Sequence, residues 1–235
     1  MSESYIRIGT IGHPGGKKQV YSKVDVVELK DARATPPKTA TAKRWRKEAP
    51  NRVAFTVQLP GYLFETPPSD APFSGDLRAY GSFQITEENL GLWEKTQRFA
   101  DGLEATALVL LTPPEFTPAK AHCDALSTFL NGVQLSGRDL VWEPRGPWDH
   151  HRAADFAAEH GMILSVDPLR DVPPSGDTAY LRLGPFAAMG SQVGVYDLTR
   201  IKEMIAVFDK VTCVFDTPRA LDDAGNMRNM LNEAE

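Results

Sequence analysis

The sequence predicts an α/β fold, a (β/α)8 barrel of TIM type, and three observations lead to this prediction. Short apolar runs, typical of parallel strands buried on both faces, recur along the chain. Most of them are separated by stretches whose apolar residues repeat at helical spacing. The chain has 235 residues, close to the roughly 250 of a usual barrel. The competing interpretation is a doubly wound open sheet, which alternates strands and helices in the same way.

Eight apolar runs are expected to form strands, and most of them end in polar or turn-forming residues. They span residues 6–12, 24–30, 53–59, 107–112, 140–143, 161–167, 179–184 and 211–216. Such a regular series of parallel strands needs crossover connections, which helices usually supply. The strand count is therefore the main support for a closed barrel.

Helices are expected over residues 39–49, 86–101, 118–131, 148–160, 197–208 and 218–231. Thr86, Thr117 and Asp197 are expected to cap three of them, because Ser, Thr, Asp and Asn side chains accept hydrogen bonds from the first helical N–H groups. The first and sixth β–α connections look too short for full helices, so the barrel is predicted to be irregular there.

Residues 60–84 interrupt this alternation with prolines, glycines and aromatic residues. The stretch is too long for an ordinary connection. Its aromatic content favours a packed excursion over disorder, because disordered segments are normally poor in aromatic residues. We therefore expect one barrel domain over residues 1–235 with an ordered excursion at about 60–84.

Composition narrows the function classes. The net charge of −5 does not favour a general nucleic-acid-binding surface. Basic residues at 43, 44, 46 and 47 are interpreted as a solvated helix face, with nucleic-acid contact as the less favoured alternative. Cys123 and Cys213 are expected to be buried thiols of a reducing compartment, in preference to a disulfide. No apolar run approaches the ~20 residues of a spanning helix. We predict a cytoplasmic protein without a membrane partner; its oligomeric state is open.

Short motifs at the expected strand ends occur in an order that resembles a known family. They are Gly-Thr-Ile-Gly at 9–12, Val-Glu at 27–28, Phe-Thr-Val at 55–57, Pro-Pro-Glu-Phe at 113–116, Glu-Pro-Arg at 143–145 followed by Trp148, Tyr-Leu-Arg at 180–182 and Phe-Asp at 215–216. Together they resemble the YecE-like family, also called domain of unknown function 72 (DUF72). The resemblance implies a (β/α)8 barrel and carries no settled reaction.

The chain also departs from that family's pattern. Gln58, Leu111 and Gly146 stand where the family usually has lysine, glutamine and histidine. Pro185 follows Arg182-Leu183-Gly184, where the family tends to Arg-x-His-Gly. Several polar groups at the strand ends are therefore changed, which puts in question any activity that the family shares.

Charged residues lie at the expected strand ends, and in a barrel these ends meet at one rim. Arg145 and Arg182 are expected to hold a carboxylate or phosphate of a small anionic ligand in a bidentate fork. Glu28 or Glu143 would act as general acid or base. The candidate catalytic residues are Glu28, Glu143, Asp167 and Asp216, and the candidate ligand-binding residues are Arg145, Arg182, Trp148, Gly12, His13 and Tyr180.

Two alternatives use the same residues differently. In one, the four carboxylates bind Mg²⁺ or Mn²⁺ for metal-assisted hydrolysis or isomerisation. In the other, the charges form a structural ion-pair network, and the protein is a binding or regulatory barrel without catalysis. The sequence requires no cofactor. The glycine-rich loop around His13 could bind phosphate, but a plain turn is the favoured interpretation.

Overall fold

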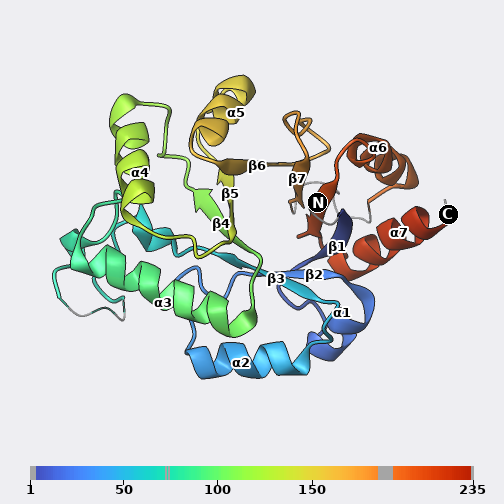
Figure 1. The fold of residues 1–235 in the computed structure, drawn as a ribbon, viewed down its shortest axis with the longest axis horizontal. Helices are drawn as coiled ribbons and strands as arrows, with labels where there is room; N and C mark the ends of the chain where they lie inside the picture. Colours follow the sequence, from blue (N-terminus) through green and yellow to red (C-terminus); the bar gives the residue numbers. More distant parts are fainter. Residues whose placement is uncertain (1–3, 72, 74, 185–192, 234–235) are drawn as a thin grey trace. The chain divides into compact units, whose positions relative to one another are not determined.

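The computed structural model describes residues 4–71, 73, 75–184 and 193–233 (Figure 1). Eight parallel strands follow one another in sequence order and close into a barrel. This confirms the predicted (β/α)8 fold over the doubly wound open sheet. The strands are β1 (Tyr5–Ile11), β2 (Val26–Leu29), β3 (Ala54–Gln58), β4 (Ala107–Thr112), β5 (Asp139–Pro144), β6 (Met162–Val166), β7 (Thr178–Leu183) and β8 (Lys210–Phe215).

The helices follow the predicted alternation. They are α1 (Lys17–Lys23), α2 (Thr39–Glu48), α3 (Glu87–Leu103), α4 (Lys120–Gly132), α5 (His150–Glu159), α6 (Val195–Ile205) and α7 (Ala220–Asn232). The first connection holds only the seven-residue α1. The sixth connection, residues 167–177, contains turns and no helix. Both irregularities were predicted from the short spacing between strands.

Two of the three predicted caps are wrong. Thr86 does cap α3, because its side chain accepts a hydrogen bond from the Asn89 N–H. Thr117 lies outside α4, which begins at Lys120, and its backbone N–H instead donates to His122 Nδ1 at 3.0 Å. Asp197 lies inside the first turn of α6, where its negative charge still favours the positive end of the helix dipole.

Contacts divide the chain into two compact units. The first comprises Met1–Leu29, Glu48–Thr56 and Ile163–Glu235, and the second Lys30–Lys47 and Val57–Met162. The prediction that the whole chain behaves as one domain stays a prediction.

The first unit is built on strands β7, β8, β1 and β2, which pair in parallel. Helix α7 packs against β1, as Figure 1 shows. Gly9 pairs with Val26 on one side and Val214 on the other. A Cβ at Gly9 would lie 1.8 Å from the Val26 carbonyl oxygen. The close approach of β1 and β2 therefore requires glycine at this position.

In the second unit, the excursion at 60–84 is packed, as predicted. It contains two short 3-10 helices, Gly61–Leu63 and Leu77–Ala79. Phe83 is buried and its ring lies 5.8 Å from those of Phe116 and Phe129. These aromatic contacts supply enough buried apolar surface to order a segment that has almost no regular structure.

Other predictions concern the whole chain. Cys123 and Cys213 are both free thiols, as expected; Cys213 is buried as predicted, whereas Cys123 is only half-buried, so that part of its prediction is wrong. Among the described residues, no helix combines the length and the apolar character that crossing a bilayer would demand.

Replacing Gly9 with alanine should destabilise the protein by about 1–3 kcal/mol or more, because the new methyl group would overlap backbone atoms that cannot move aside. Urea denaturation measures the change. The matched control is Gly91→Ala on α3, where a Cβ meets nothing within 4 Å. That change should stabilise the protein by roughly 1 kcal/mol through helix propensity. Equal stability of the two variants would contradict the close approach of β1 and β2.

Candidate functional site

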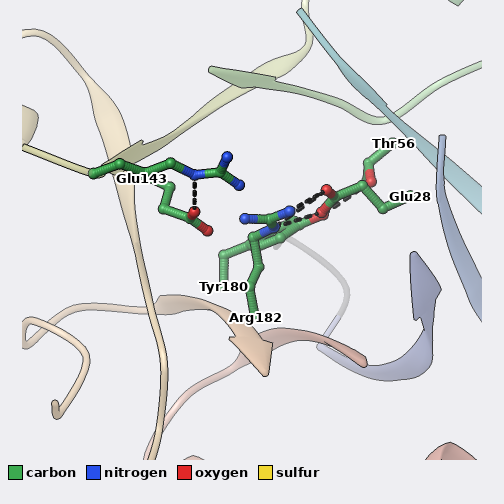
Figure 2. Close-up of polar contacts among 6 residues, drawn as sticks. Glu28, Thr56, Glu143, Tyr180 and Arg182 are labelled. Carbon is green, nitrogen blue, oxygen red and sulfur yellow. Dashed lines mark hydrogen bonds and ion pairs between the residues drawn. The ribbon is translucent and has the colours of Figure 1, made fainter. Parts of the chain in front are cut away.

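Two buried charges of the first unit, Glu28 and Arg182, form an ion pair. Glu28, on β2, is fully buried, and Arg182, on β7, is 7% exposed. Arg182 donates from Nη2 to Glu28 Oε1 at 2.8 Å and from Nε to both carboxylate oxygens at 3.1 and 3.2 Å. The two charges therefore neutralise each other in a two-pronged pair of the kind that arginine and carboxylates form best (Figure 2).

Tyr180 and Thr56 extend this pair into a network. The Tyr180 hydroxyl donates to Glu28 Oε2 at 2.8 Å, and Thr56 Oγ1 lies 2.9 Å from the same hydroxyl. Because the single phenolic proton is given to Glu28, Thr56 donates to the Tyr180 oxygen. Burial and then the negative charge of Glu28 raise the pKa of Tyr180 well above its ordinary value. Tyr180 is therefore a neutral hydrogen-bond donor.

Strand geometry explains why these residues meet. Tyr180 and Arg182 are two residues apart on β7, so both point to the same face of the sheet. Strands β1 and β8 lie between β2 and β7 in the barrel order. Contact between side chains of β2 and β7 therefore crosses the barrel interior, as Figure 2 shows for Glu28, Tyr180 and Arg182. Neither Arg182 nor Tyr180 stands at the surface.

Gly12 and His13 belong to the same unit but to separate contacts. The Gly12 backbone N–H donates to the Glu28 carbonyl oxygen at 2.8 Å. His13 Nε2 lies 3.1 Å from the Tyr21 hydroxyl, and the two rings meet edge to face. These contacts agree with a turn after β1, which was the favoured interpretation of the glycine-rich loop.

Asp167 and Asp216 follow β6 and β8. Asp167 Oδ1 accepts a hydrogen bond from the Leu169 N–H at 3.0 Å, and its Oδ2 lies 3.7 Å from Arg170 Nε. Burial is the main cause that raises the pKa of Asp167 above its ordinary value, and the Leu169 N–H and Arg170 oppose it. The Asp216 backbone N–H donates to the Leu183 carbonyl oxygen at 2.8 Å.

The second unit places Glu143 and Arg145 together at the end of β5. Arg145 Nε donates to Glu143 Oε1 at 2.8 Å, and the side chains are 35% and 22% exposed respectively. The Arg145 backbone N–H donates to the Thr112 carbonyl oxygen at 3.1 Å. Within the described residues, Glu143 is the only side chain that Arg145 binds. Its two Nη groups are therefore available to a ligand.

Trp148 is anchored beside this pair. Its indole Nε1–H donates to the Phe116 carbonyl oxygen at 2.8 Å, and its ring stacks on that of Phe116. Gly146 lies against the same carbonyl, since a Cβ there would come within 2.3 Å of it. This contact explains why glycine stands where the resembled family has histidine. Trp148 fixes the loop, and its role in ligand binding stays a prediction.

The structure thus brings together two groups of predicted residues. One contains Glu28, Tyr180 and Arg182, and the other Glu143 and Arg145. Among the described residues, no three or more His, Cys, Asp or Glu side chains form a group that could hold a metal ion. Of the altered family positions, Gln58 is buried, Leu111 is half-buried, and Pro185 lies outside the described residues.

Two polar residues of the interior, Thr56 and Ser165, are not among the predicted site residues. Thr56 donates a hydrogen bond to the Tyr180 hydroxyl oxygen. Its position in the alternation of β3 was the only sequence signal that its side chain faces the interior. Ser165 pairs in register with Tyr180. Its buried hydroxyl has no hydrogen-bond partner in the part of the chain that the structure describes. A serine in a short apolar strand gives no sequence signal of such a position.

Closure of eight parallel strands defines the class: this is a (β/α)8 barrel with a charged pair across its interior. No protein-family model matches the sequence, and no curated protein matches it. Its structural neighbours include DUF72 family proteins. One from Enterococcus faecalis V583 has a TM-score of 0.73 at 16% identity, covering 99% of both chains. Another from Thermotoga maritima MSB8 has a TM-score of 0.67 at 16% identity, covering 97% of this chain and 99% of that one.

A xylose isomerase domain protein from Planctomyces limnophilus is also similar. Its TM-score is 0.60 at 13% identity, covering 99% of this chain and 97% of that one. At such identities the likeness establishes the fold. It agrees with the resemblance to the YecE-like family that the strand-end motifs indicated.

Breaking the interior ion pair should cost about 3–5 kcal/mol for either Glu28→Gln or Arg182→Met, because each leaves a buried charge without its partner. The double variant should lose much less than the sum of the two single losses. Urea denaturation of all four proteins measures the coupling. Glu94→Gln is the control, since its pair with Arg98 is more than half exposed on both sides and should contribute under about 1 kcal/mol. Additive losses would contradict a coupled pair.

The raised pKa of Asp167 predicts a pH dependence of stability. A carboxyl whose pKa is higher in the folded state than in the unfolded state binds more protons when folded. The free energy of unfolding therefore falls as the pH rises from the unfolded-state pKa to the folded-state pKa of Asp167. Asp167→Asn removes this loss, so the variant should gain stability relative to the parent from about pH 4 upward. Melting temperatures of both proteins between pH 4 and 7 check this. A difference that stays constant with pH would contradict it.

Proposed function

We propose that this chain is a divergent member of the DUF72 family and a cytoplasmic enzyme that acts on a small anionic substrate. The substrate would carry a carboxylate or a phosphate. The observation that supports this most directly is the combination of contacts and exposure at the Arg145 side chain. Its Nε is held by Glu143 at 2.8 Å while its side chain stays 35% exposed. An arginine fixed at one edge and open at the other is suited to binding an anion.

The chemistry follows from this geometry. The terminal N–H groups of a guanidinium match the spacing of two oxygens of a carboxylate or phosphate. Glu143 orients the arginine beforehand, which lowers the entropy lost when a ligand binds. The same carboxylate would stand beside the bound anion and is our candidate general acid or base. Arg182 has a different role in this proposal, because its Nε and Nη2 are occupied by Glu28.

Some structural neighbours suggest which anions to test. They are named as a xylose isomerase domain protein, a D-tagatose 3-epimerase-like protein and an L-ribulose 3-epimerase, with TM-scores of 0.60, 0.52 and 0.56. Barrels with the same fold host unrelated chemistries, so the names serve only to choose candidates. Sugar phosphates and sugar acids combine a polyhydroxy body with the anionic group that Arg145 would bind.

The alternative is a binding or regulatory barrel without catalysis. A specific observation favours it: Glu28, Arg182, Tyr180 and Thr56 form a continuous buried network. That network fits a structural role without any ligand. A Mg²⁺- or Mn²⁺-dependent hydrolase or isomerase, with Asp167 and Asp216 among its ligands, stays a prediction.

A thermal-shift screen of sugar phosphates, sugar acids, inorganic phosphate and divalent metals tests the proposal. A ligand present at about 100 times its dissociation constant adds about 2.7 kcal/mol of stability, or roughly 5–10 °C for a chain of this length. We expect an anion to produce this shift in the parent and in Arg98→Ala, and to lose it in Arg145→Ala. Arg98 is a matched control, an exposed arginine paired with a glutamate.

Catalysis is tested separately on the anion that binds. NMR of that compound should show conversion by the parent and none by Glu143→Gln, with Arg145 still binding the anion in the variant. Binding without conversion in the parent would favour the regulatory alternative. A shift that survives Arg145→Ala would place the ligand elsewhere and overturn the proposed site.

A further inference from the structure

Positive charge is concentrated in one short stretch of an otherwise acidic chain. Residues 30–47 hold seven lysines and arginines and one aspartate, a formal charge of +6. The whole chain has −5, so the remaining residues together carry −11. Such separation of charge creates a local positive field that survives the negative total, and this is the electrostatic signature of surfaces that bind polyanions.

The structure shows that most of these cations face solvent. Lys30, Arg33, Lys38, Lys43 and Lys47 are all exposed. None of these five makes an ion pair within residues 4–71, 73, 75–184 and 193–233. An ordinary solvated helix face usually mixes both signs of charge. These five cations have no acidic partner among the described residues, so their charge is not neutralised by an ion pair there.

Helix α2 holds two of these exposed cations, Lys43 and Lys47, on its outer side. On its inner side Ala42 is buried, and a Cβ at Gly102 of α3 would lie 2.8 Å from the Ala42 Cβ. Trp45 meets Phe99 edge to face at 5.9 Å. The outer side carries Lys43 and Lys47, one turn apart, and Lys38 precedes the helix. At 1.5 Å per residue, Lys43 and Lys47 lie about 6 Å apart along the axis.

Charge complementarity selects the partner. We propose that residues 30–47 bind the phosphate backbone of single-stranded nucleic acid. A phosphate backbone offers regularly spaced negative charges, which a group of exposed lysines can neutralise without reading bases. An anionic membrane is the weaker fit, because interfacial helices bury an apolar face in the lipid. The apolar side of α2 is packed inside the protein, and residues 30–47 contain none of the large exposed hydrophobic side chains.

The salt dependence of binding is the quantity to measure. For single strands the slope of log K against log salt is about −0.7 per neutralised phosphate, so five contacts give at most about −3.5. Removing three lysines should bring the slope about 2 closer to zero. A change in this slope distinguishes phosphate contacts made by residues 30–47 from a general attraction between the oligonucleotide and the protein.

The experiment is fluorescence anisotropy with a labelled uridine 20-mer between about 25 and 200 mM salt, a range over which phosphate contacts change affinity strongly. The test variant is Lys38→Gln/Lys43→Gln/Lys47→Gln. The control variant, Lys18→Gln/Lys23→Gln/Lys120→Gln, changes exposed lysines elsewhere and loses the same net charge. We expect the test variant to bind at least tenfold more weakly with a shallower slope, and the control to stay within twofold of the parent. Unchanged melting temperatures show that both variants are folded.

Three results would overturn the inference. One is no binding of the oligonucleotide by the parent at the lowest salt. Another is an equal loss in the two triple variants, which would mean that total charge alone decides. The third is binding to vesicles containing phosphatidylserine without binding to the oligonucleotide, which would make the segment a membrane contact.

Discussion

The ion pair between Glu28 and Arg182 is the constraint on which the first unit depends. Placing a carboxylate and a guanidinium in a barrel interior costs several kcal/mol per ion in lost hydration. The cost is offset only when the charges meet with good geometry and their remaining hydrogen-bonding capacity is used. Here Arg182 makes contact with both carboxylate oxygens, and Tyr180 supplies a further proton to Oε2. The network tolerates little displacement of β2 relative to β7.

This constraint also divides the two arginines that the sequence had grouped. Arg182 and Arg145 have the same charge and both stand at strand ends, yet their surroundings give them different capacities. Arg182 is 7% exposed and held by Glu28, so binding a ligand would require breaking a buried pair. Arg145 is partly exposed and held through one nitrogen, so its remaining donors can bind an anion at little cost. Exposure, and not charge, distinguishes the structural arginine from the candidate binding residue.

Much of the fold could be predicted because it rests on local signals. Apolar runs such as that of β4 identify buried parallel strands, and the short first and sixth connections follow from spacing alone. The partner of Glu28 could not be predicted in this way, since Arg182 lies 154 residues away and the pair forms only once β2 and β7 face each other across the closed barrel. By contrast, Arg145 follows directly after β5 and lies two residues from Glu143, so their closeness is already expected from the sequence if the extended backbone continues by one residue. The cap at Thr117 failed although its contacts are local: α4 begins only at Lys120, and the Thr117 N–H binds His122, five residues further on.

Gly146 connects the departures from the YecE-like pattern to the candidate site. Its backbone approaches the Phe116 carbonyl so closely that a Cβ would lie 2.3 Å away, and that carbonyl also accepts the indole N–H of Trp148. A histidine at 146 would therefore displace either Phe116 or the loop that presents Arg145. Glycine at 146 and the position of Arg145 therefore depend on the same backbone packing. An activity that relies on a histidine at this position would need another group here, and the Glu143–Arg145 pair is the charged group nearest to it in the sequence.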